Sequence, residues 1–157
     1  GQLISTLVTP VRSRLRLDLK IFGFWGGILV LKLLAMAVLT ARQRVKKQVF
    51  ANEEDAVRSK KAKVSFNDPD VERVRRAHLN DLENVVPWFL ATLLWLGTGP
   101  STWLAGLLIR GFVASRILHT IVYAVIPLPQ PSRGIAFGVG FLITGYMATA
   151  TVLHYCH

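Results

Sequence analysis

The sequence predicts an all-α integral membrane protein, a bundle of four transmembrane helices in a single domain that covers residues 1–157. Hydrophobic residues make up 52% of the chain and its mean hydropathy is +0.40, which is high for a soluble domain. The apolar residues form long runs that basic residues flank or interrupt, as is typical of membrane segments. The net charge of +10 is therefore assigned to the edges of membrane helices, and no nucleic-acid partner is expected.

The first transmembrane helix is predicted over residues 17–42. Its apolar run from Ile21 to Ala41 is long enough to cross a bilayer of about 30 Å, at about 1.5 Å per residue. No small-residue cleavage site interrupts the run early, so we expect a retained helix rather than a signal peptide. Lys32 is the interior charge of this run, and we expect it to snorkel or to face the bundle.

A polar segment over residues 43–68 follows, and its excess of Lys and Arg places it on the cytosolic side of the membrane. Four basic residues also precede the first helix, and in this topology they lie on the opposite side. They disagree with the rule that positive charge stays inside, but the loop carries more basic residues and decides the orientation. The basic residues before the first helix are Arg12, Arg14, Arg16 and Lys20.

The second helix is predicted over residues 69–97, with Asp68 as its cap and Pro69 at its first position. Its first half, VERVRRAHLNDLEN at residues 71–84, is strongly charged, and the uncharged remainder has only 13 residues. That remainder is too short to cross the hydrocarbon layer, so the charged half must lie in or at the edge of the membrane and be covered by other helices. Pro87 is expected to kink the helix and to free the carbonyl group of Glu83.

Two further helices are predicted over residues 102–126 and 133–153, joined by the proline-rich turn PLPQPSR. The last helix is uncharged after Arg133, and it carries small residues at a spacing of four, which permits close helix packing. Three connections, each either tight or basic, join the four helices and predict an up-down-up-down order. The small residues form two pairs, Gly134 with Gly138 and Ala136 with Gly140.

Ionisable residues inside the membrane segments are candidates for a functional site, because burying charge in lipid is costly. Helical spacing places several of them on common faces, and all lie near one side of the membrane. Arginines, carboxylates and amides together suit a small ligand that carries both carboxylate and ammonium groups. A structural ion-pair network that holds helices or subunits together explains the same residues equally well. The residues concerned are Glu72, Arg73, Arg76, Asn80, Glu83 and Asn84 on the second helix, Arg116, His119 and Tyr123 on the third, Arg133 at the start of the fourth, and Arg44 at the end of the first.

The run at residues 71–84 resembles the signature of the microsomal glutathione transferases, within the superfamily of membrane-associated proteins in eicosanoid and glutathione metabolism. Three more segments match in order: VFANEEDA at 49–56, RILHTIVY at 116–123 and PLPQPSR at 127–133. The resemblance covers the chain from about residue 22 to residue 150. A charged run inside a membrane helix makes it specific.

The resemblance implies a homotrimer in the endoplasmic reticulum membrane and the outer mitochondrial membrane, with glutathione bound between neighbouring subunits near the cytosolic face. It implies conjugation of glutathione to hydrophobic electrophiles that arrive from the membrane lipids, reduction of lipid hydroperoxides, and no metal. Arg133 would stabilise the glutathione thiolate. The residues that would contact glutathione are Arg44, Arg75, Arg76, His78, Asn80, Glu83, His119 and Tyr123.

Two other functions stay open on the same fold, namely a prostaglandin E synthase-type isomerase and a non-catalytic lipid-binding scaffold or small transporter. Asp55 matches an aspartate that has a catalytic role in the synthase. The sequence also departs from the transferase pattern, because Glu53 replaces a proline and Ala56 stands where the mammalian transferases have a stress-sensing cysteine. The resemblance also indicates one extra residue between Tyr123 and Arg133.

Overall fold

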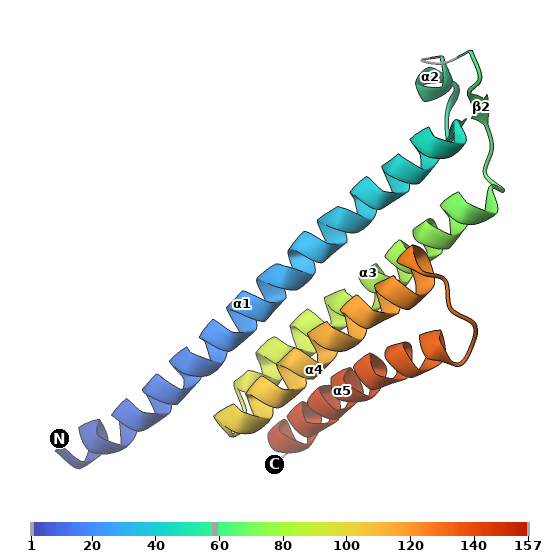
Figure 1. Cartoon of the computed structure of the whole chain (residues 1–157). Coiled ribbons are helices and arrows are strands. Elements are labelled where there is room, and N and C mark those ends of the chain that lie inside the picture. Colours follow the sequence, from blue (N-terminus) through green and yellow to red (C-terminus); the bar gives the residue numbers. More distant parts are fainter. Residues whose placement is uncertain (1, 58–59, 157) are drawn as a thin grey trace.

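The computed structural model describes residues 2–57 and 60–156, with side chains described from Arg12 onward, and it is almost entirely helical. Four long helices dominate the structure (Figure 1). They are α1 (Gln2–Lys47), α3 (Pro69–Leu96), α4 (Thr102–Thr120) with its π-helical continuation η1 (Ile121–Val125), and α5 (Ser132–Tyr155). Between α1 and α3 lie the strand β1 (Val49–Phe50), the short helix α2 (Glu53–Ala56) and the strand β2 (Lys63–Val64).

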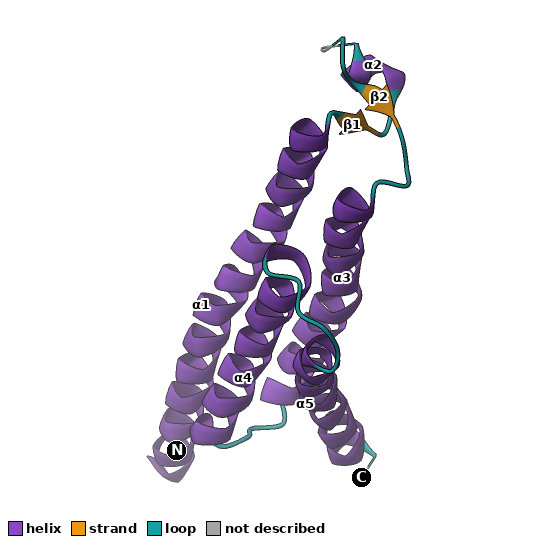
Figure 2. Ribbon diagram, turned by 45° about the vertical axis from the view of Figure 1, so that its right-hand side comes forward, coloured by secondary structure: helices purple, strands orange, loops and turns teal. Residues whose placement is uncertain are grey.

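The long helices alternate in direction, with α1 and α4 running one way and α3 and α5 the other (Figure 1). The β1–α2–β2 segment forms a small cap beyond the end of α1 and the start of α3 (Figure 2), and its two strands pair in parallel. In the described part of the chain, three helical segments are long and apolar enough to cross a membrane: Arg12–Lys47, Thr102–Val125 and Ser132–Tyr155. Helix α3 has 28 residues, but the charges in its first half keep it outside this group.

Helix α1 is longer than the apolar run that predicts it, since it begins at Gln2 rather than near residue 17 and ends at Lys47 rather than Arg42. Hydropathy marks where a helix enters the membrane, and it does not mark where the helical backbone begins. The helix ends where Gln48 adopts a left-handed conformation with φ of 53°.

Helix α3 begins at Pro69, directly after the N-cap residue Asp68. The Asp68 carboxylate accepts hydrogen bonds from the backbone N–H groups of Asp70 and Val71, both at 3.1 Å. Asp70 also forms ion pairs with Lys47 at the end of α1 and with Arg73, the latter at 2.7 Å. These contacts fix the start of α3 beside the end of α1, at the same end of the bundle as the cap.

The apolar core lies where all four long helices meet. Trp88 of α3 is fully buried and stacks on Phe112 of α4, with ring centroids 4.5 Å apart and planes 2° from parallel. Phe22 and Leu29 of α1 and Met147 of α5 belong to the same buried cluster. The core therefore holds α3 and α4 rigidly behind the polar residues that lie further along both helices.

One of the two small-residue pairs of α5 makes a close helix contact within this chain. Ala136 and Gly140 are buried, and a Cβ atom added at Gly140 would lie 3.0 Å from Ser115 Oγ of α4. A Cβ atom at Gly138 would meet nothing within 4 Å. The Ala136–Gly140 pair therefore makes the close contact that its small residues permit, whereas the Gly134–Gly138 pair makes no such contact with another helix within the described chain.

Candidate functional site

A buried network of charges joins α1, α3 and α4. Asp81 and Arg116 are both fully buried, and Arg116 donates to Asp81 Oδ1 from Nη2 at 2.8 Å and from Nε at 3.2 Å. Lys32 of α1 forms an ion pair with the second carboxylate oxygen, Oδ2. One carboxylate thus compensates two cations, and Lys32 faces the bundle as the sequence predicts.

Arg116 also orients two of the predicted site residues. Its Nη2 donates to the Asn80 side-chain oxygen at 2.7 Å and lies 3.3 Å from His119 Nδ1. A guanidinium group can only donate hydrogen bonds, so His119 Nδ1 accepts and the ring proton lies on Nε2. For the same reason the oxygen of Asn80 faces Arg116, which leaves the two N–H donors of its amide for a ligand.

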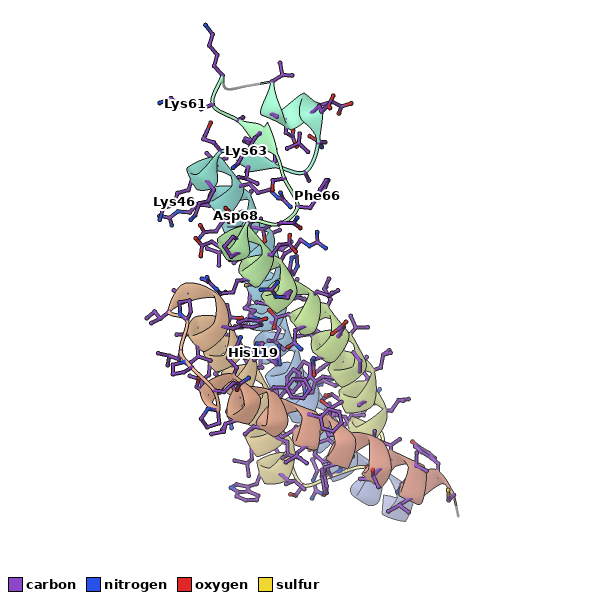
Figure 3. All side chains as sticks on the ribbon, turned by 90° about the vertical axis from the view of Figure 1, so that its right-hand side faces the viewer. Lys46, Lys61, Lys63, Phe66, Asp68 and His119 are labelled. Carbon is purple, nitrogen blue, oxygen red and sulfur yellow. The ribbon has the colours of Figure 1, made fainter. Side chains whose placement is uncertain are left out.

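A polar cavity of about 360 Å³ opens beside this network, between α3, η1 and the start of α5. Figure 3 shows one of its lining residues, His119, inside the bundle and well below the loop residues Lys63 and Asp68. The residues that line the polar cavity are Asn80, His119, Tyr123, Gln130, Arg133, Gly134 and Phe137.

Tyr123 is the common contact of the cavity's cations. Arg76 Nε donates to the Tyr123 hydroxyl at 3.4 Å, and the guanidinium carbon of Arg133 lies 4.7 Å from the centre of the Tyr123 ring. The His119 ring meets the same ring edge to face, with centroids 5.5 Å apart. Arginines from α3 and α5 and a histidine from α4 therefore converge on one side chain.

The π-helix η1 carries Tyr123 to this position. Its wider turn replaces α-helical bonding over Ile121–Val125, and the backbone N–H of Ile126 donates to the carbonyl of Ile121 at 2.8 Å. A π-turn holds one more residue than an α-helical turn and so rotates the side chains that follow it, and such turns are frequent at functional sites.

An apolar groove of about 450 Å³ continues from the polar cavity along the outside of the bundle, between α3 and α5. The two depressions share Asn80 and Phe137. Glu83 lines the apolar groove one turn along α3 from the shared residue Asn80, and Pro87 lies one turn further. The residues that line the apolar groove are Asn80, Glu83, Asn84, Pro87, Phe137, Phe141, Thr144, Gly145 and Ala148.

The polar cavity is electropositive. Arg76 and Arg133 approach it without a carboxylate partner among the described residues, and its lining residues include no carboxylate. Glu83 lines the adjoining apolar groove. The Nε atom of Arg133 is buried and has no hydrogen-bond partner in the described chain. A buried donor without a partner is costly, so this guanidinium is suited to bind an anion.

Three predicted contact residues do not reach the polar cavity within one chain. Arg75 is exposed and lies 3.7 Å from Glu72, and His78 is half-buried on α3. Arg44 lies in the last turn of α1, and its buried Nη1 atom has no partner in the described residues. Asp55 is exposed on α2, within the cap at the end of the structure (Figure 2), and does not line the cavity.

The buried charge network of Lys32, Asp81 and Arg116 beside the cavity was not predicted from the sequence. Asp81 and Lys32 were not assigned a site role, and Arg116 was placed on the correct face of its helix without a partner. The adjacency of Asp81 to Asn80, and the spacing of three residues between Arg116 and His119, were the signals available. Pairing them requires the relative rotation of α3 and α4, which no local pattern encodes.

Fold and site together define a helical membrane protein with an arginine-bearing cavity that adjoins an apolar groove. The chain belongs to the MAPEG family, whose model matches residues 22–153. Among its relatives, microsomal glutathione S-transferase 1 of Mus musculus is 47% identical and that of Homo sapiens 45% identical over 131 residues, which is 81% of this chain and 84% of each relative. Prostaglandin E synthase of Bos taurus is 35% identical over 131 residues, 83% of this chain and 85% of the relative.

Proposed function

We propose that the chain is a membrane-bound glutathione transferase that conjugates glutathione to hydrophobic electrophiles. The observation that carries the proposal is the convergence of Arg76, Asn80, His119 and Arg133 around Tyr123, in a cavity that continues into an apolar groove. Identities of 45–47% with microsomal glutathione S-transferase 1, against 34–37% with prostaglandin E synthases, favour the transferase over the isomerase.

The groups around the polar cavity match the groups of glutathione. The two carboxylates of the tripeptide suit arginine, which binds carboxylates through paired hydrogen bonds, and the amide N–H donors of Asn80 suit its carbonyl oxygens. The ammonium group suits Glu83, the carboxylate of the adjoining apolar groove. A ligand with both signs of charge would therefore use the arginines and this carboxylate together.

Arg133 is the residue proposed to favour the thiolate. A free thiol has a pKa near about 8.5, and the thiolate is the nucleophile. A lowering of the pKa of the glutathione thiol by about two units requires roughly 2.7 kcal/mol of differential stabilisation, which a nearby guanidinium group and hydrogen bonds can supply.

In the reaction the thiolate sulfur forms a bond to the electrophilic carbon of the second substrate, and the leaving group departs with the bonding electrons. The apolar groove, lined by Phe137, Phe141 and Ala148, is suited to hold that substrate beside the polar cavity. With a lipid hydroperoxide the same thiolate would attack the outer peroxide oxygen. The products would be an alcohol, water and, with a second glutathione, glutathione disulfide.

A homotrimer of four-span subunits accounts for the remaining polar surface. We propose that α3 crosses the membrane together with the three more apolar helices. Its surface exposes the charged residues Arg75, Arg76 and Glu83, which lipid does not tolerate. Contacts with a neighbouring copy would cover this surface, and Arg44, Arg75 and His78 would reach the cavity from that neighbour.

The proposed location is the endoplasmic reticulum membrane and the outer mitochondrial membrane, with the cap and the polar cavity on the cytosolic side.

The proposal is tested by turnover of the purified protein with glutathione and chlorodinitrobenzene. We expect glutathione-dependent formation of the conjugate, saturable in glutathione. A protein that binds neither glutathione nor the electrophile, or that converts a prostaglandin endoperoxide but conjugates no electrophile, would contradict it.

The assembly is tested separately by native mass spectrometry in detergent. We expect a complex of three subunits that retains activity. A monomer with full activity would exclude a site shared between subunits, since every cavity residue would then come from one chain.

A further inference from the structure

The N-terminal part of α1 extends beyond what a bilayer requires. The helix has 46 residues and is therefore about 69 Å long, while the hydrocarbon layer is about 30 Å thick. Its N-terminal end lies apart from the ends of α4 and α5 (Figure 1). The apolar run of α1 starts at Ile21, so the residues just before it emerge from the membrane at the end opposite the cap and the polar cavity.

A basic stripe runs along this emerging segment. Arg12, Arg16 and Lys20 are spaced four residues apart and so lie on one face of the helix, with Leu15 and Leu19 between them. All five side chains are exposed and line a shallow depression of about 400 Å³. Exposed cations alternating with exposed leucines are unusual for a surface that meets water alone.

The basic stripe has no acidic partner in the described part of the chain. Its three cations form no ion pair there, and the carboxylate nearest in sequence, Asp18, is 2% exposed and lies on the opposite, bundle-facing side of α1. Three positive charges on one face are therefore left for an anion from outside the chain.

The membrane fixes where that anion must lie. Lys20 directly precedes the apolar run, and Arg16 and Arg12 lie about 7.5 Å and about 13.5 Å beyond Ile21 along the helix. The polar headgroup layer on each side of the hydrocarbon is roughly 5–7 Å thick. Lys20 and Arg16 are thus at the depth of lipid phosphate groups, and Leu19 between them is near the depth where acyl chains begin. Leu15 and Arg12 lie further out, and the long Arg12 side chain must reach back toward the headgroup layer.

We propose that Arg12, Arg16 and Lys20 form a binding site for the phosphate headgroup of an anionic phospholipid in the leaflet opposite the polar cavity. Charge complementarity selects an anionic headgroup, and Leu19, exposed between Arg16 and Lys20 beside the apolar run, favours a lipid over a soluble anion. The site also gives the basic residues before the first span a role that the orientation rule for membrane proteins leaves unexplained. It depends on no step of the glutathione chemistry.

The test uses the purified, delipidated full chain, titrated with phosphatidylglycerol or phosphatidylcholine of matched acyl chains and followed by native mass spectrometry of the first bound lipid. Wild type should bind phosphatidylglycerol more tightly than phosphatidylcholine. Arg16→Gln should weaken phosphatidylglycerol binding about fivefold, and the triple change of Arg12, Arg16 and Lys20 to Gln by roughly 100-fold, since each cation near a lipid surface contributes about that factor. Phosphatidylcholine binding should not change.

Arg14→Gln is the matched control, because it removes the same charge two residues away on another face of the same exposed helix. It should leave the preference for phosphatidylglycerol intact, and all variants should conjugate glutathione at the wild-type rate. Equal effects of Arg14→Gln and Arg16→Gln, equal affinity for the two lipids in wild type, or displacement of the lipid by millimolar inorganic phosphate would each overturn the proposal.

Discussion

At the scale of single residues, Asp81 is the most consequential buried group. Asp81→Asn would leave the cations of Lys32 and Arg116 facing a neutral amide in the interior. Loss of one partner from a buried ion pair typically lowers the free energy of unfolding by about 3–5 kcal/mol, and we expect a loss of that size in chemical denaturation in detergent. Asp55→Asn, at an exposed carboxylate of α2, is the control and should change stability by less than about 0.5 kcal/mol. An equal loss of unfolding free energy in the two variants would mean that the buried ion pairs of Asp81 do not stabilise the fold.

Substitution of Glu83 is expected to affect glutathione binding more than the rate of the chemical step. Glu83→Gln should weaken glutathione binding roughly tenfold, because a charge-assisted hydrogen bond to the ammonium group is lost. Once the site is saturated, the thiolate signal and the turnover rate should change far less. Binding is measured by equilibrium dialysis with labelled glutathione, and Glu54→Gln on the exposed α2 serves as control. Unchanged affinity in Glu83→Gln would remove this residue from the site.

The sequence predicted which residues form the candidate site but not how their side chains are oriented. Motif resemblance carries residue identity, so Arg76, Asn80, His119, Tyr123 and Arg133 were all named, and the structure brings these five side chains together. Whether each acts on glutathione stays a prediction. Side-chain orientation depends on how two helices rotate against each other, so the role of Arg116 in fixing Asn80 and His119 could not be read from either helix alone.

At the scale of elements, α5 offers a matched pair of glycines. Gly140→Ala should destabilise the protein by about 1–3 kcal/mol, because its new Cβ atom would lie 3.0 Å from Ser115 Oγ and 3.4 Å from the Phe112 ring. Gly138→Ala meets open space and should be neutral or stabilising by up to about 1 kcal/mol through helix propensity. Thermal unfolding in detergent measures both. A large loss for Gly138→Ala would show that another copy packs against that face of α5.

The boundary of a helix was predictable where a capping side chain determines it. The Asp68–Pro69 pair predicts the start of α3, and the helix begins there because the Asp68 carboxylate binds the first backbone N–H groups. The first helix extends further than predicted because nothing in the basic segment from Arg12 to Lys20 breaks it. The π-helix at Tyr123 has no local sequence signature, although the extra residue expected in the following connection is consistent with a wider turn nearby.

At the scale of the whole molecule, the chain has no cysteine at the position where its family resemblance would place a thiol switch. Ala56 stands at the position of the sensor cysteine, and the one cysteine, Cys156, is exposed beyond the end of α5, at the opposite end of the bundle from the cap (Figure 1). Treatment with N-ethylmaleimide should therefore leave the conjugation rate within about twofold. A several-fold increase would mean that modification at Cys156 is transmitted along α5 to the cavity, and a Cys156→Ser variant would then abolish it.

The polar cavity and the apolar groove are suited to different substrates. The polar cavity lies in the half of the bundle nearer the cap, at the end of α4 and the start of α5. The apolar groove leads from that cavity along α3 and α5. This arrangement suits a water-soluble thiol that enters from one membrane face and an apolar partner that enters from the lipid.

The central claim is that Arg133 holds glutathione as a thiolate. The measurement is the absorbance of the thiolate near about 240 nm when saturating glutathione is added to wild type and to Arg133→Ala, with the conjugation rate taken on the same samples. The account predicts that Arg133→Ala folds and binds glutathione, shows a smaller thiolate signal at neutral pH, and conjugates about 10–100-fold more slowly, which corresponds to about 1.4–2.7 kcal/mol. If Arg133 only anchors the start of α5, the variant will show the wild-type thiolate signal and turnover, and that result would contradict the account.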